Sequence, residues 1–251
     1  MIFKRAVAKL RAQDWMAITI ELVIVTLGVI IALAAQQWAD GQVQRSKMDA
    51  SVGALRDELA EHYGYAVEYR VVYPCLQAQL DQLRDRVLTS GATLNPAPAY
   101  SEEHFRYVLR TPNKVYPTDA WQAAVNDGTA QRLDPSIRRA LSGHYGRLPE
   151  FWQMTTANDA SSQGFLALTY RMPLDPAVRY SIVKEIEQVR GRMETMDYNN
   201  GQVIDYIQQV DMIPPAEQAR AVVTRYGTYH FCKAHGLPMR PLKDAMQAVP
   251  N

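Results

Sequence analysis

Residues 14–40 read DWMAITIELVIVTLGVIIALAAQQWAD, and this stretch decides how the rest of the chain is organised. It contains a run of 21 residues, starting at Trp15, in which Glu21 is the one charged side chain. A helix of that length is roughly 30 Å long, which matches the hydrocarbon core of a bilayer. Trp15 and Trp38 flank the run, as tryptophan does at membrane–water interfaces. The sequence therefore predicts one transmembrane helix over residues 15–36.

Charge is distributed unevenly around this apolar run. The chain has a formal net charge of +1, but residues 1–14 alone carry four basic residues and one acidic residue. Apolar residues recur between them at helical spacing, which predicts an amphipathic basic tail on an anionic membrane surface. Because basic segments stay in the cytoplasm, we expect a single-pass protein of the bacterial inner membrane, with a cytoplasmic N-terminus and residues 37–251 in the periplasm. The neutral remainder argues against nucleic acid as a partner.

A cleavable signal peptide is the alternative interpretation of this N-terminus. Ala32-Leu33-Ala34 matches a small-x-small cleavage site, with cleavage after Ala34. The apolar run is longer than the roughly 7–15 residues of a signal-peptide core, which favours an uncleaved anchor. Both interpretations export residues 41–251.

Glu21 needs an explanation, because a carboxylate inside a bilayer costs a few kcal/mol. One interpretation is that it is protonated or reaches the nearby headgroups. The other is that Glu21, Gly28, Ala32 and Ala35 form one helical face. Small residues on such a face let a second helix approach closely, and a carboxylic acid there can hydrogen-bond across the pair. This second interpretation predicts self-association through the transmembrane helix.

Helical periodicity continues beyond the apolar run. Hydrophobic residues make up 47% of the chain, which is enough for a folded body with a core. Apolar and aromatic side chains step by four and three along the segment that follows the span: Met48, Val52, Leu55, Leu59, His62, Ala66, Tyr69 and Tyr73. This spacing predicts a stalk helix over residues 41–73, which continues from the transmembrane helix and ends at Pro74.

Aspartate–proline pairs mark the starts of two later helices. Asp134-Pro135 precedes IRRALSGHYGRL, and Asp175-Pro176 precedes a long amphipathic run that ends at Pro214-Pro215. We also expect a short helix over residues 101–110 and a last helix over residues 216–235, closed by Gly236 and Pro238. No alternating strand pattern is found. The predicted fold is all-α, with one N-terminal transmembrane helix, a stalk helix and a helical-bundle-like exported domain.

Two cysteines, Cys75 and Cys232, suit an oxidising compartment, where one disulfide between them is permitted. The alternative is two unrelated buried thiols. Four tyrosines crowd the end of the predicted stalk: Tyr63, Tyr65, Tyr69 and Tyr73. Their rings suit either an interaction surface or packing of the body against the stalk. Asn200 is the one polar residue in an apolar seam, where it either fixes register or oligomeric state or marks a helix break.

No catalytic or cofactor motif is present in the sequence. His230, Cys232 and His235 are zinc-ligand types, but His230 lies elsewhere around the helical turn, so no metal site is predicted. His62 and His144 are expected as packing residues without a partner nearby. The glutamates along the stalk are expected to form ordinary helix charge pairs with Arg56 and Arg70 rather than a carboxylate dyad: Glu58, Glu61 and Glu68. The catalytic residues, if any, are unknown, and no cofactor is predicted.

Two segments together show a familiar pattern. The first reads Trp15, Glu21, VIVTLGVIIAL, Trp38 and Asp40. The second reads Thr118, Trp121, Gly128 and then LDPSIRRALSGHYGRL. The chain thereby resembles an uncharacterised family of bacterial single-pass membrane proteins with helical bodies. It departs from that pattern at Gln37, where a small residue and an asparagine are common. The resemblance implies a membrane anchor but no activity.

These observations favour a membrane-anchored periplasmic helical protein that acts as a non-catalytic interaction or scaffold module and as a homo-oligomer. Its expected partners are the lipid bilayer, a second copy of the chain and another membrane or envelope protein. One alternative is a ligand-sensing subunit, which would signal through a partner because a tail of 14 residues cannot hold an output domain. Another is a cell-envelope enzyme whose site is not visible in the sequence.

Overall fold

The computed structural model describes residues 15–102 and 105–248, so the basic tail expected at residues 1–14 lies outside the described residues. The chain divides into two compact units, Met1–Val52 and Gly53–Asn251. The first described element is α2 (Trp15–Thr89). The elements after it are β1 (Tyr100–Glu102), β2 (Phe105–Tyr107), α3 (Asp119–Asn126), η1 (Ala130–Arg132), α4 (Pro135–Gly164), η2 (Phe165–Thr169), α5 (Pro176–Gln209), α6 (Ala216–Val223), α7 (Gly227–Ala234) and α8 (Leu242–Ala245). The fold is all-α, as the sequence predicts.

In the first unit, α2 presents apolar side chains to the outside. The large apolar residues whose side chains are described in the segment 16–43 are all exposed, from Met16 at 72% to Val23 at 49%. Nothing in the described chain covers them. A helix that is hydrophobic on all sides needs either a protein core or a membrane around it. This helix is long and apolar enough to cross a membrane.

In the second unit, the same helix is part of the core. Its inward residues from Leu55 onward are almost inaccessible to solvent: Leu55, Leu59, Ala66, Val67, Val72, Leu76 and Leu80. The stalk predicted over residues 41–73 is therefore a core helix of the body from Leu55 onward. Its four-and-three spacing reflects packing against α4 and α5 within the chain.

Pro74 does not end this helix, contrary to the prediction from the sequence. α2 continues through Pro74 to Thr89. A proline in a helix interior costs about 3 kcal/mol, because it removes one backbone hydrogen bond and clashes with the preceding turn. Val72, Cys75 and Leu76 on both sides of it are buried. Their tertiary packing offsets the local cost and keeps the helix continuous.

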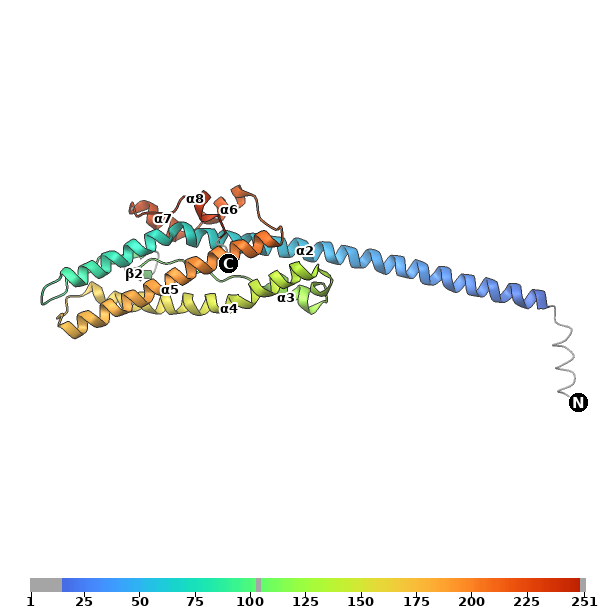
Figure 1. Cartoon of the computed structure of the whole chain (residues 1–251), viewed down its shortest axis with the longest axis horizontal. Coiled ribbons are helices and arrows are strands. Elements are labelled where there is room, and N and C mark those ends of the chain that lie inside the picture. The colour runs from blue at the N-terminus through green and yellow to red at the C-terminus, as the bar shows by residue number, and fades with distance from the viewer. Residues whose placement is uncertain (1–14, 103–104, 249–251) are drawn as a thin grey trace, which may run out of the picture. The chain divides into compact units, whose positions relative to one another are not determined.

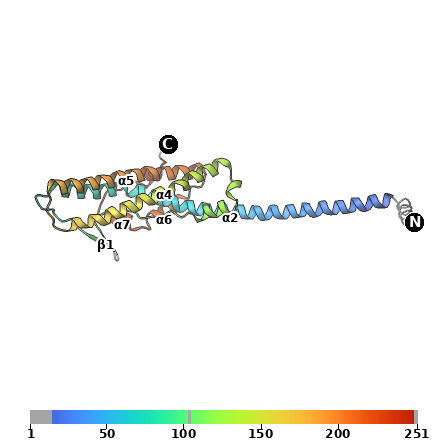
Figure 2. The ribbon, with the colours of Figure 1, turned by 90° about the horizontal axis from the view of Figure 1, so that it is seen from below.

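The second unit is built on three long helices, α2, α4 and α5, which lie side by side in both views (Figures 1 and 2). The predicted starts of α4 and α5 are confirmed. Asp134 accepts a hydrogen bond from the backbone N–H of Ser136, and Asp175 accepts one from Val178, both at 2.8 Å. α5 runs to Gln209 without a break at Asn200.

The C-terminal helices lie along one side of α2 (Figure 1). The prediction of a single helix over residues 216–235 is wrong. The structure has two helices there, α6 and α7, and the extended backbone of Tyr226 separates them. A Cβ atom added at Gly64 of α2 would lie 2.4 Å from Val222 of α6, so these helices approach too closely for a larger residue. α7 ends at Ala234 and is followed by Gly236, whose φ of +63° favours glycine, as the sequence predicts.

The helix predicted over residues 101–110 is also wrong, because β1 and β2 form a short antiparallel hairpin there. Tyr100 pairs with Tyr107, and their rings stack 6.0 Å apart between centroids. Both rings also meet Phe231 of α7 edge-on, at 5.0 and 5.7 Å. These aromatic contacts come from distant residues, so a local signal for a helix start at Ser101 is overridden.

Candidate functional site

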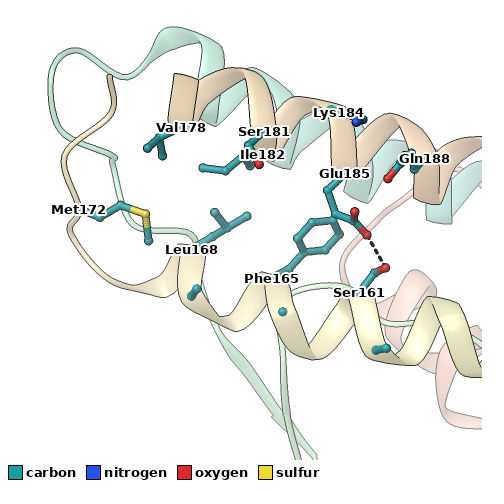
Figure 3. Close-up of a pocket in the computed structure, with 13 residues that line it drawn as sticks. Ser161, Phe165, Leu168, Met172, Val178, Ser181, Ile182, Lys184, Glu185 and Gln188 are labelled. Carbon is teal, nitrogen blue, oxygen red and sulfur yellow. Dashed lines mark hydrogen bonds between the residues drawn. The ribbon is translucent and has the colours of Figure 1, made fainter. Parts of the chain in front are cut away.

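A groove opens between the end of α4 with η2 and the start of α5 (Figure 3). Its volume is about 710 Å³, within the range of about 300–1,000 Å³ that is typical of small-molecule sites. The connecting loop is held in place by backbone hydrogen bonds to the segment after α2. The amide of Leu94 donates to the carbonyl of Met172, and the amide of Leu174 donates to Ala92, at 2.9 and 2.8 Å. This pairing fixes Met172 at one end of the groove.

The floor of the groove is apolar. Phe165 and Leu168 of η2 are each 4% exposed, and Val178 and Ile182 of α5 are half-buried opposite them. In Figure 3 the side chains of Leu168, Met172, Val178 and Ile182 extend into the space between the two helices. Such a lining offers an apolar ligand a surface that is already shielded from water on two sides.

The other end of the groove is polar (Figure 3). Ser161 donates a hydrogen bond to Glu185 at 2.6 Å, and Arg192 donates one to Ser161 at 2.7 Å. Arg192 also lies 3.7 Å from the Glu185 carboxylate. The charge of Glu185 is thus compensated within the protein. Lys184, by contrast, is exposed at the groove and forms no ion pair or hydrogen bond within the described part of the chain.

A second polar feature, the histidine pair, is fully enclosed by the bundle. His62 of α2 and His144 of α4 hydrogen-bond ring to ring at 2.7 Å, and the other ring nitrogen of His62 donates to the carbonyl of Pro117, also at 2.7 Å. Burial lowers the pKa of His62 to about 4. Burial and the neighbouring ring of His62 lower the pKa of His144 to about 3. Both imidazoles are therefore neutral at pH 7.

This pair corrects the expectation that His62 and His144 have no partner. They are 82 residues apart in the chain, and no local pattern links them. The expectation for the glutamates was wrong as well. Glu58 accepts the amide hydrogens of Ala120 and Trp121, at 2.8 and 3.3 Å, and so satisfies the N-terminus of α3.

Glu68 is a buried carboxylate with an incomplete set of partners. It is 0% exposed, and neither of its oxygens accepts a hydrogen bond from the described residues. The Lys114 ammonium lies 3.6 Å away and stacks over the ring of Tyr226. Burial raises the pKa of Glu68 to about 7, although Lys114 opposes this shift. Burial also lowers the pKa of Lys114.

The small cavity beside this pair does not suit a substrate. It is lined by Tyr65, Tyr69, Lys114, Tyr116, Thr155 and Asn200, among others. Its volume of about 10 Å³ is close to the minimum of about 10–15 Å³ that one water molecule needs. A carboxyl group with this pKa would suit proton transfer, but the cavity beside its partner Lys114 is too small for a reacting molecule.

The four predicted tyrosines contact the rest of the body. Tyr63 and Tyr69 are buried, and Tyr65 and Tyr73 are half-buried. Tyr65 donates a hydrogen bond to Glu61 and stacks edge-on against Tyr116 and Tyr226. The Arg240 guanidinium lies 5.7 Å from the Tyr73 ring. Packing, the second of the two interpretations, therefore describes these rings better than an open interaction surface.

Asn200 is buried inside the body, at 1% exposure. Its side-chain oxygen accepts a hydrogen bond from Tyr116 at 2.6 Å, and its amide donates to the carbonyl of Met196 at 2.8 Å. The helix break that the sequence left open does not occur. The polar seam position connects α5 to the loop that carries Tyr116.

The structure joins Cys75 and Cys232 in a disulfide across a separation of 157 residues. The bond ties α7 to α2 directly after Pro74. Since Cys232 is engaged in it, the His230, Cys232 and His235 group has no free thiolate for a metal. Within residues 15–102 and 105–248, no group of three or more ligand-type side chains is placed to hold a metal ion.

The predicted association face lies open on the first part of α2. Glu21, Gly28, Ala32 and Ala35 are all exposed. A Cβ atom added at Gly28 would meet nothing within 4 Å in the described chain. The face therefore has room for a second helix.

The chain matches no protein-family model, no curated protein and no solved structure.

The sequence alone does not predict the groove, because its lining residues have the pattern of an ordinary amphipathic helix. The one available signal was Phe165-Leu166-Ala167-Leu168, an apolar run between two helices.

Proposed function

We propose that this protein is a non-catalytic binding module, anchored in the bacterial inner membrane by α2, with its helical body in the periplasm. Its binding site is the groove between α4, η2 and α5. The resemblance of the N-terminal segment to bacterial single-pass proteins supports the same placement.

The anchor is supported by the surface of α2. Its described large apolar side chains in the segment 16–43 are exposed on all sides, and a bilayer would remove them from water. Side-chain hydroxyls need partners in lipid, and Thr26 already donates a hydrogen bond to the carbonyl of Leu22 at 2.7 Å. The segment is thus equipped for a medium without water.

The periplasmic side is supported by two features. Residues 1–14 carry four basic residues, whereas Arg45 and Lys47 are the basic residues that closely follow the apolar run. The Cys75–Cys232 disulfide suits an oxidising compartment, since thiols in the cytosol are kept reduced.

The observation that carries the binding role is the open apolar groove of about 710 Å³. Catalysis has weaker support, because the carboxylate at the groove, Glu185, is engaged by Ser161 and Arg192. The histidine pair and Glu68, whose pKa values are shifted by burial, are enclosed by the body and are not exposed to a substrate. Binding needs only the shape and the apolar surface that the groove provides.

Self-association is part of the proposal. The open face formed by Glu21, Gly28, Ala32 and Ala35 permits close contact between two copies of α2. Gly28→Leu should lower the yield of chemically crosslinked dimer in membranes. Ile30→Leu, on the opposite side of the helix, should leave the yield unchanged. A strictly monomeric wild-type protein at native abundance would contradict this part.

Membrane topology is tested with the full chain carrying a C-terminal alkaline phosphatase, which is active only outside the cytoplasm. We expect high phosphatase activity, and we expect the chain to remain with the membrane after alkaline carbonate extraction. A cytoplasmic fusion that is inactive, or a full-length chain that washes off, would refute the anchor and its orientation.

Groove binding is tested by placing the photoreactive residue benzoylphenylalanine at Ser181, which lines the groove, in the full chain in cells. The matched control is Tyr198, an exposed position further along α5. We expect an adduct from position 181 and none from position 198. Gly164→Leu should block the groove, whereas Gly146→Leu should not, and both glycines of α4 have open space around the added Cβ. Equal adducts from both positions, or none, would contradict the site.

A further inference from the structure

The groove has two ends of different chemistry, and together they describe a ligand. One end holds apolar side chains from η2, the connecting loop and α5 (Figure 3). They are Leu168, Met172, Val178 and Ile182. The other end holds Ser161, Lys184, Glu185 and Gln188 (Figure 3). A molecule that fills the groove therefore needs an apolar part and a polar part.

At the polar end, Lys184 is a positive charge without an ion-pair partner among the described residues. Among the described residues that line the groove, Lys184 and Glu185 are the two charged ones, and their charges would cancel if both were free. Glu185 is already compensated by Arg192 and hydrogen-bonded by Ser161. Lys184 has no such partner among the described residues, so its ammonium is available to an anion. One free cation next to an apolar floor matches a ligand with one negative charge.

The size of the groove suits a small molecule. Its volume of about 710 Å³ lies within the range of about 300–1,000 Å³ that is typical of small-molecule sites. A flexible single chain with a charged end fits this space and its two kinds of lining.

We propose that the groove binds a long-chain fatty carboxylate, with its hydrocarbon chain against Leu168, Met172 and Ile182 and its carboxylate at Lys184. This inference rests on the proposed binding function of the groove and specifies its ligand. Burial of methylene groups supplies the affinity, because apolar surface leaves water on both partners. The ion pair at the rim supplies orientation and discriminates against uncharged chains of the same length.

The test uses native membranes that contain the full chain and a C16 fatty acid bearing a diazirine and an alkyne. After illumination, labelled tryptic peptides are identified by mass spectrometry. We expect strong labelling of the peptide 172–179, which contains Met172 and Val178. The transmembrane segment provides an internal reference, because it is labelled through the bilayer whether or not the groove binds.

Two matched pairs sharpen the result. Gly164→Leu should reduce groove labelling relative to the transmembrane reference at least fivefold, and Gly146→Leu should leave the ratio unchanged. Lys184→Gln should reduce labelling by the carboxylic acid probe severalfold and leave labelling by the corresponding methyl ester unchanged.

Groove labelling that is absent, or that ignores Gly164→Leu, would overturn the fatty-carboxylate inference. Equal sensitivity of acid and ester to Lys184→Gln would overturn the role of the charge. A polypeptide or a lysophospholipid captured by benzoylphenylalanine at position 181 would likewise reject the fatty carboxylate, while the groove-binding function would stand. The absence of any adduct at position 181 would reject both.

Discussion

The two parts of α2, residues 16–43 and residues 55–89, have opposite surfaces. In the first part, large apolar side chains such as Leu27 are exposed. In the second part, polar side chains such as His62 and Glu68 are buried. Each part departs from the usual arrangement of a soluble helix, in which apolar residues face inward and polar residues face water. The first part of α2 therefore needs an apolar medium around it, and the second part needs specific partners from the rest of the body.

The largest expected effect comes from removing the bond that fixes the second part of α2 to α7. Replacing both Cys75 and Cys232 by serine should lower the free energy of unfolding by about 5 kcal/mol, because the disulfide closes a loop of more than 150 residues in the unfolded chain. Guanidinium unfolding of the full chain measures this change. A reductant should shift the wild type to the same midpoint and leave the double variant unaffected. Unchanged midpoints would show that the bond does not hold the body together.

The histidine pair should make the body sensitive to acid. The unfolded chain takes up protons near pH 6.5, whereas the folded pKa values of His62 and His144 are about 4 and about 3. The stabilising effect is therefore complete above pH 6.5 and is lost as the pH falls below it. By pH 5 the two groups together should lower the free energy of unfolding by about 4 kcal/mol.

Unfolding curves at pH 7 and pH 5 measure this dependence. Replacing both histidines by glutamine should reduce the number of protons taken up on unfolding by up to two, and so should reduce the slope of the free energy of unfolding against pH. This holds whatever the stability of that variant at pH 7. His230→Gln, at an exposed histidine, is the control and should keep the wild-type dependence. A double variant with the wild-type slope would show that the pair does not titrate as the structure requires.

A leucine-to-alanine pair contrasts the two parts of α2 directly. Leu59 is 0% exposed, so Leu59→Ala should destabilise the body by about 3–4 kcal/mol through lost burial and the cavity left behind. Leu27 is 51% exposed, so Leu27→Ala should leave the unfolding of the body unchanged. Denaturant unfolding of both variants gives the comparison. Equal losses would mean that the first part of α2 also packs against protein.

Glu68 should have the smallest of these effects, and one opposite in sign to that of the histidines. Its pKa rises from 4.5 to about 7 on folding. The free-energy cost of burying Glu68 is therefore smallest below pH 4.5 and grows as the pH rises through 7. Glu68→Gln removes this penalty. Between pH 5 and pH 8, the variant should gain about 2–3 kcal/mol relative to the wild type.

Thermal or denaturant unfolding at the two pH values measures the gain. Asp49→Asn, at an exposed carboxylate in the first unit, should show no such gain. If Glu68→Gln is equally destabilised at both pH values, Glu68 is ionised in the folded state and is held by Lys114 more strongly than its burial opposes.

Local signals in the sequence identified several elements correctly. The aspartate caps of α4 and α5 and the glycine end of α7 depend on neighbouring residues, and the structure has them where predicted. The predictions failed where distant residues decide. Pro74 stays within α2 because packing around it outweighs its local cost. The segment 101–110 is a hairpin because its aromatic rings meet α7.

The sequence by itself determined the all-α class and the long apolar helix, because helical periodicity and apolar length are properties of adjacent residues. The tertiary structure alone decided the disulfide, the histidine pair, the burial of Glu68 and the groove. Each of these depends on the distance between side chains from separate segments. That distance is set by how α2, α4, α5 and α7 pack, and packing is a property of the whole body.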